Sequence, residues 1–103
     1  MNEDQLGQTI SAQIPKYFRQ LPHHRYWLAV VHYHPDHCFN YFFYVKRLGV
    51  NTYSYPLGSE ADQVSNLKKT LAIFREHYQF PVQFINFDLE AQRQLQRWLN
   101  HHH

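Results

Sequence analysis

The segment Tyr26–Arg47 limits the fold most, because it predicts a β-hairpin that is apolar on both of its faces. Residues Tyr26–Tyr33 and Phe39–Arg47 are rich in β-branched and aromatic side chains, which favour strands. Between them, His34–His37 contains a proline and an aspartate, two residue types that are common in turns. The segment therefore predicts two adjacent antiparallel strands.

Neither face of these strands is polar. Side chains alternate between the two faces of a strand, and both sets are apolar in each strand of this hairpin. An antiparallel sheet with one face in water would alternate apolar and polar residues instead. Two arrangements would cover the hairpin: helices on both faces, or helices on one face and a partner on the other. That partner would be another protein, a second copy of this chain or a flat ligand.

The beginning of the chain predicts a helix. Apolar residues recur at helical spacing over Leu6–Leu21. Pro15 lies among them, so either the helix kinks there or it begins at Ser11, with Ser11 as N-cap and Pro15 in the first turn. Pro22 is expected to end it.

Two further segments predict helices. Ser59–Asp62 supplies a serine N-cap and acidic residues for a first turn, and an apolar stripe follows over Val64–Tyr78. Asp88 is expected to cap a last helix, in which apolar residues share one face.

Two more strands complete the predicted fold. Asn51–Tyr55 forms a short strand that Pro56 and Gly58 are expected to stop, and Val82–Phe87 forms the other. The predicted class is α+β, in the order α-β-β-β-α-β-α. We expect an antiparallel three-strand meander and a fourth strand delivered by a helical crossover.

The bulk composition indicates one folded domain. The chain has 103 residues, of which 44% are hydrophobic, and a net charge of +2. We expect a single domain over residues 1–100, with the histidines at 101–103 as the remnant of a purification tag. The net charge is small for a nucleic-acid-binding protein. Cys38 is the only cysteine and no signal peptide is evident, so we expect a cytoplasmic protein without an internal disulfide.

Histidines gather at the predicted hairpin turn. The run His32–His37 has the pattern His-x-His-x-Asp-His, which resembles the first metal-binding motif of the metallo-β-lactamase fold hydrolases. The resemblance implies that His32, His34, Asp36 and His37 bind two metal ions and activate a water between them. It covers only this run, and the later ligands of that family have no match here, so we do not assign the family. The hypothesis that remains is a divalent transition-metal site of His32, His34 and His37, and no other cofactor is expected.

The element order also resembles that of double-stranded RNA-binding domains. Their first turn carries a Pro-x-His step, here Pro35–His37, followed by an aromatic strand, here Tyr41–Val45. That family grips phosphates with lysines at the start of its second helix. In this chain the corresponding segment Ser59–Asp62 is acidic, and Lys68 and Lys69 come about two turns later.

A third resemblance is to nucleases with a Pro-Asp…(Asp/Glu)-x-Lys site. Pro35 and Asp36 match its first part, and Lys46 matches its lysine. Tyr44 stands where the second carboxylate would be, and without that carboxylate a magnesium ion is poorly held.

The sequence therefore favours a non-catalytic binding or regulatory module that acts through a protein interface on an aromatic sheet face, either with another protein or as a homodimer. A nucleic-acid-binding domain is the first alternative, and a metal-binding protein or enzyme at His32–His37 the second. The expected partner-binding residues are Tyr26, Trp27, Tyr33, Tyr41, Phe43, Tyr44, Tyr53 and Tyr55. The cations that could form a patch for an anionic partner are Lys46, Arg47, Lys68, Lys69, Arg93 and Arg97.

Overall fold

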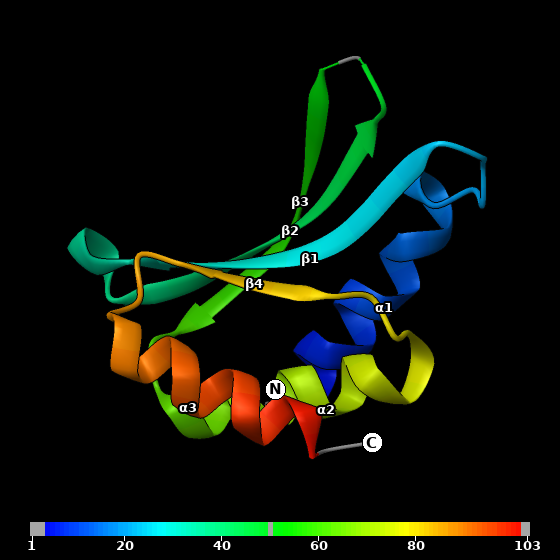
Figure 1. Ribbon diagram of the computed structural model, residues 1–103. Coiled ribbons are helices and arrows are strands. Elements are labelled where there is room, and N and C mark those ends of the chain that lie inside the picture. The colour runs from blue at the N-terminus through cyan, green and yellow to red at the C-terminus, as the bar shows by residue number, and fades with distance from the viewer. Residues whose placement is uncertain (1–3, 50, 102–103) are drawn as a thin grey trace.

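The computed structural model describes residues 4–49 and 51–101 and places three helices on one side of a four-stranded sheet (Figure 1). The strand order is β3-β2-β1-β4, in which the first three strands are antiparallel and β4 runs parallel to β1. The α+β class and the helical crossover are therefore confirmed. The elements are α1 (Asp4–Tyr17), β1 (His24–Tyr33), a 3-10 turn (His34–Asp36), β2 (Cys38–Arg47), β3 (Thr52–Ala61), α2 (Val64–His77), β4 (Val82–Ile85) and α3 (Leu89–Asn100).

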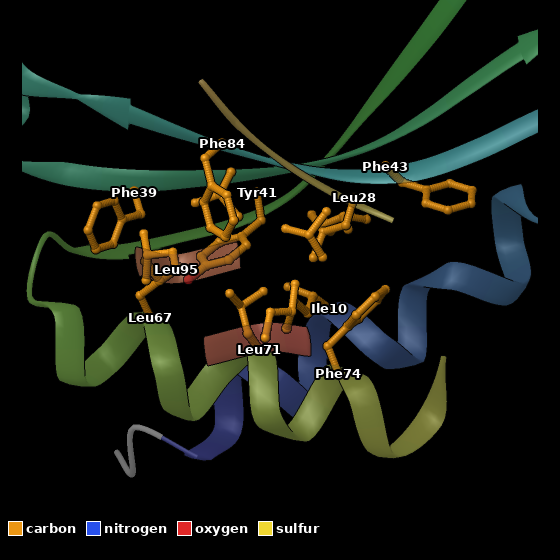
Figure 2. Packing of buried hydrophobic residues seen from close by; sticks show 14 of the residues in the cluster. Ile10, Leu28, Phe39, Tyr41, Phe43, Leu67, Leu71, Phe74, Phe84 and Leu95 are labelled. Carbon is orange, nitrogen blue, oxygen red and sulfur yellow. The ribbon is translucent and has the colours of Figure 1, made fainter. Parts of the chain in front are cut away.

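The core lies between the sheet and the helices. Leu28 of β1 and Tyr41 and Phe43 of β2 share the face that points to the helices, and each is at most 1% exposed. They belong to one buried cluster with Ile10 of α1 and Leu71 of α2 (Figure 2). Two leucines of α3 join the same cluster. The predicted arrangement with helices on both faces is therefore wrong, because the helices lie on one side of the sheet only (Figure 1).

Strand β3 is longer than the sequence predicts. It passes through Pro56 and Gly58, so the prediction that these residues stop the strand is wrong. β3 is an edge strand, where a proline need not remove a ladder hydrogen bond. A register shift against β2 leaves Leu57 as an extra residue, and this bulge turns Leu57 into the core, where it is 4% exposed.

The start of α2 also differs from the prediction. Ser59 lies inside β3, and the helix begins at Val64 without a side-chain cap. Glu60 is held in the strand because its carboxylate accepts hydrogen bonds from the hydroxyls of Tyr41 and Thr70. Glu60, which the sequence predicts in a first helical turn, is therefore held in β3 by its contacts with β2 and α2.

Helix α1 is continuous through Ser11 and contains Pro15, so of the two predicted alternatives the one with a start at Ser11 is wrong. It ends at Tyr17 rather than at Pro22.

None of the helices in residues 4–49 and 51–101 is long and apolar enough to cross a membrane.

The last strand is shorter than predicted, and the last helix is capped as predicted. β4 ends at Ile85, and Asn86 adopts a left-handed backbone with φ of 64°. The Asp88 carboxylate then accepts a hydrogen bond from the backbone nitrogen of Ala91 at 2.7 Å. The chain therefore turns sharply from the end of β4 into the capped start of α3.

Candidate functional site

The side of the sheet that faces away from the helices is not covered by any described element (Figure 1). Directly paired residues share a face of a sheet, so the register identifies the side chains on this surface. We call it the open face. It comprises Arg25, Trp27, Val31, Tyr33, Cys38, Asn40, Phe42, Tyr44, Lys46, Thr52, Ser54, Pro56, Ser59, Ala61, Gln83 and Ile85. Ala29 is on the same side but is fully buried.

Aromatic rings gather over the two central strands of the open face. Trp27 and Tyr44 pair across β1 and β2, with ring centroids 5.2 Å apart, and Phe42 lies edge-on to Tyr44. All three side chains are half-buried. The Trp27 indole also donates a hydrogen bond to the Gln83 side chain at 3.0 Å, which fixes the ring over β4. The result is an ordered aromatic platform that keeps part of its surface in water.

Two cations face each other beside this platform. Arg25 of β1 is paired directly with Lys46 of β2, one position along from Trp27 and Tyr44 on the same face. Glu60 is the only acidic residue in the four strands, and it is directed to the core. A hollow of about 440 Å³ next to the two cations is lined by His23, His24, Arg25, Lys46 and Leu48.

The predicted partner-binding residues fall on both sides of the sheet. Trp27, Tyr33 and Tyr44 lie on the open face. Two of the residues predicted to bind a partner, Tyr41 and Phe43, are buried in the core and are therefore not available to one. The other three residues point to the helical side of the sheet: Tyr26, Tyr53 and Tyr55. Of these, Tyr53 is 53% exposed, near the end of the β2–β3 hairpin.

The predicted cationic patch is divided between the two layers. Lys46 lies on the open face, and Arg47 is the last residue of β2. The Lys68 ammonium lies 5.6 Å from the centroid of the Trp98 ring, between α2 and α3. The other three cations are exposed on those helices: Lys69, Arg93 and Arg97.

A second concave site lies at the carboxyl ends of the parallel strands β1 and β4. This strand-end pocket has a volume of about 390 Å³. Its lining comes from the end of β1, the start of β2, the turns that follow β1, β3 and β4, and the first two turns of α2 and α3. Open sheets commonly bind ligands beyond the carboxyl ends of their strands. The lining residues are His32, His34, Phe39, Asp62, Val64, Lys68, Asn86, Phe87, Asp88, Ala91, Gln94 and Leu95.

The histidines of the predicted metal motif are used differently in the structure. His32 Nε2 lies 3.1 Å from the Asp62 carboxylate, and His34 Nε2 lies 3.2 Å from the backbone oxygen of Asn86. His37 is exposed, and its Nδ1 is 3.9 Å from Asp62. Among the described residues no group of three or more His, Cys, Asp or Glu side chains is arranged to hold a metal ion. The metal-site hypothesis therefore gains no support from this geometry.

Sequence reasoning missed Arg25 and Phe42 on the open face, and Asp62 and Asn86 in the strand-end pocket. The hairpin turn would have identified Arg25 and Phe42, because it fixes the register of β1 and β2. No local signal links Asp62 to His32, since 30 positions separate them in the chain. No family model, curated protein or solved structure matches the chain.

Proposed function

We propose that the protein is a non-catalytic binding module whose open face binds single-stranded nucleic acid. The observation that carries this proposal is the aromatic platform flanked by two facing cations, on strands that present no acid to that side. Proteins that bind single strands combine these two elements: aromatic rings on which bases stack, and cations that follow the phosphates.

The rings of the aromatic platform are held in place by contacts within the protein itself, which favours stacking of bases on them. Trp27 is held by its hydrogen bond to Gln83 and by its contact with Tyr44. A ring that is already fixed loses little conformational entropy on binding. Other nucleic-acid-binding modules stack bases on aromatic side chains of an exposed four-stranded sheet.

The charge of the open face favours an anionic partner. Arg25 and Lys46 are directly opposite each other, and like charges in that position destabilise a sheet. A phosphate between them would relieve the repulsion. A homodimer through two open faces would instead enclose two cations from each copy and no strand acid from either.

A protein partner is the second candidate, and one observation favours it. Several residues of the open face are of types that are enriched at protein interfaces: Trp27, Phe42, Tyr44 and Arg25. Acidic side chains are depleted at such interfaces. A partner with an acidic patch would suit this face. Light scattering after gel filtration tests the homodimer, and a molecular mass of one chain counts against it.

Fluorescence anisotropy with a labelled oligouridine tests nucleic-acid binding. We expect binding that weakens steeply as salt is raised, because released counterions drive it. Reversing both charges with Arg25→Glu and Lys46→Glu should weaken binding by about tenfold or more, since two phosphate contacts are lost.

The matched control reverses the same number of charges on the helical layer. Arg93→Glu with Arg97→Glu changes the net charge equally but leaves the open face intact. We expect it to weaken binding far less than the first pair. Equal losses in the two double variants, or no salt-dependent binding by the unmodified protein, would contradict the proposal.

Trp27 offers a direct readout of stacking. The chain has two tryptophans, so the variant Trp98→Phe leaves Trp27 as the only one. We expect the fluorescence of Trp27 to be quenched as oligouridine is added, because a base stacks on the indole. Binding without a change in this fluorescence would place the nucleic acid elsewhere on the protein.

A further inference from the structure

We propose that the strand-end pocket binds a small organic cation, namely an amine or amidine attached to a flat apolar group. This site is on the helical side of the sheet and does not depend on the proposed function of the open face. Its volume of about 390 Å³ is within the range of roughly 300–1,000 Å³ that is usual for small-molecule sites.

One wall of the strand-end pocket is made of flat rings. Phe39 and Phe87 are stacked, with centroids 5.5 Å apart and planes 15° apart. The His32 ring lies 5.0 Å from Phe39 and 5.4 Å from Phe87, and the His34 ring lies 3.9 Å from His32. Leu95 is also part of the lining. A flat apolar group is the ligand body that such a wall accommodates.

Hydrogen bonds hold the two histidines at the pocket. A carboxylate and a backbone carbonyl can only accept, so Nε2 of His32 donates to Asp62 and Nε2 of His34 donates to the Asn86 oxygen. In each neutral ring the lone pair is therefore on Nδ1. The same partners fix the orientation of both rings, which prepares the site before a ligand binds.

The charges at the strand-end pocket favour a cation. Asp62 and Asp88 contribute two carboxylates to the lining, and Lys68 contributes the one ammonium. The Lys68 ammonium lies over the Trp98 ring, at 5.6 Å from its centroid. Apart from the two histidines, the charged side chains of the lining therefore sum to one negative charge. A ligand that brings hydrogen-bond donors and a positive charge complements it, whereas a carboxylate ligand would meet two carboxylates.

A left-handed backbone turn lies at the edge of the pocket. Asn86, which lines it, has φ of 64°. Asparagine adopts this conformation more readily than most other residues. The left-handed turn at Asn86 comes directly after β4, which brings Phe87 and Asp88 to the pocket.

Benzamidine is the probe for this proposal, and benzoate and benzamide are its anionic and neutral counterparts of similar shape. We expect saturable changes in the backbone amide NMR signals of Asn86 and Ala91 as benzamidine is added to the full chain. Benzamide should bind more weakly than benzamidine, and benzoate should not bind.

Two variants test whether the carboxylate and the cavity are responsible. Asp62→Asn removes the charge and should weaken benzamidine binding by about tenfold. Asp36→Asn is its matched control, because Asp36 is exposed in the neighbouring 3-10 turn and does not line the pocket. Ala91→Leu should abolish binding by filling the pocket, and leucine is a good helix former at this position in α3.

Equal binding of benzoate and benzamidine would overturn the proposal, as would the absence of saturable changes. So would unchanged binding by Ala91→Leu, which keeps the test decisive if Asp62→Asn does not fold. Oligouridine binding is measured at the open face, so failure of the pocket and failure of that surface are observed separately.

Discussion

The two faces of the sheet have similar side chains and different surroundings. Phe42 and Phe43 are neighbours on β2, yet Phe43 is fully buried in the core and Phe42 remains partly exposed on the open face. The difference comes from the helices, which all lie on the side of Phe43 (Figure 1). Aromatic content therefore does not identify the core face of a strand; the position of the apolar helix faces does.

Truncation of these two phenylalanines should give the largest contrast between the faces. Phe43→Ala removes a fully buried ring and leaves a cavity, which should lower the free energy of unfolding by about 3–5 kcal/mol. Phe42→Ala should lower it by only about 1 kcal/mol, because the ring is partly exposed already. Urea denaturation of both variants measures the difference. Equal losses would show that the open face is also buried in solution.

The buried tyrosine should show a smaller effect with its own pH dependence. Burial, together with the Glu60 carboxylate, raises the pKa of Tyr41 well above its usual 10.0. Tyr41→Phe removes a hydrogen bond to that carboxylate and should cost about 1–3 kcal/mol at pH 8.

The sign of the pH dependence follows from the raised pKa. Above pH 10 the unfolded chain releases the Tyr41 proton while the folded protein keeps it, so stability falls as the pH rises. The advantage of the unmodified protein over Tyr41→Phe should therefore be complete below pH 10 and shrink above it. Urea denaturation at pH 8 and pH 11 measures this. Tyr44→Phe on the open face is the control, and a similar change in its stability difference would contradict the assignment to Tyr41.

The smallest expected effect has the opposite sign. Lys46→Glu places a carboxylate opposite Arg25 and should raise the free energy of unfolding by about 0.5 kcal/mol at low salt. The gain should fade at high salt, because exposed charges are screened. The free energy of unfolding of Lys46→Gln should lie between those of the unmodified protein and Lys46→Glu. A loss of stability in Lys46→Glu would mean that the facing cations do not repel each other, which would remove one support of the proposed function.

Local pattern predicted most of the elements correctly. The β1–β2 hairpin, its turn and the Asp88 cap each depend on residues close in sequence, and the structure confirms all three. The extent of β3 and the start of α2 were predicted wrongly for a shared reason. Pro56, Ser59 and Glu60 have ordinary turn and helix-start chemistry, and contacts from β2 and α2 override it.

The candidate sites were less predictable than the elements. Trp27, Tyr44 and Tyr41 are all predicted to bind a partner, but only the first two lie on the open face, because the sequence alone does not say which face the helices cover. The strand-end pocket was not predicted at all. It needs β4 beside β1 and Asp62 beside His32, and both are contacts between distant parts of the chain.

The bulge and the proline of β3 have a consequence for how the protein behaves in concentrated solution. A free strand edge is a template on which another chain can extend the sheet, and proline and bulges interrupt that template. β3 carries Pro56, which has no N–H, next to the bulged Leu57, and the opposite edge, β4, spans only Val82–Ile85. Neither edge strand favours the edge-to-edge pairing that extends a sheet into fibres. The partner that we propose would therefore contact the open face rather than an edge of the sheet.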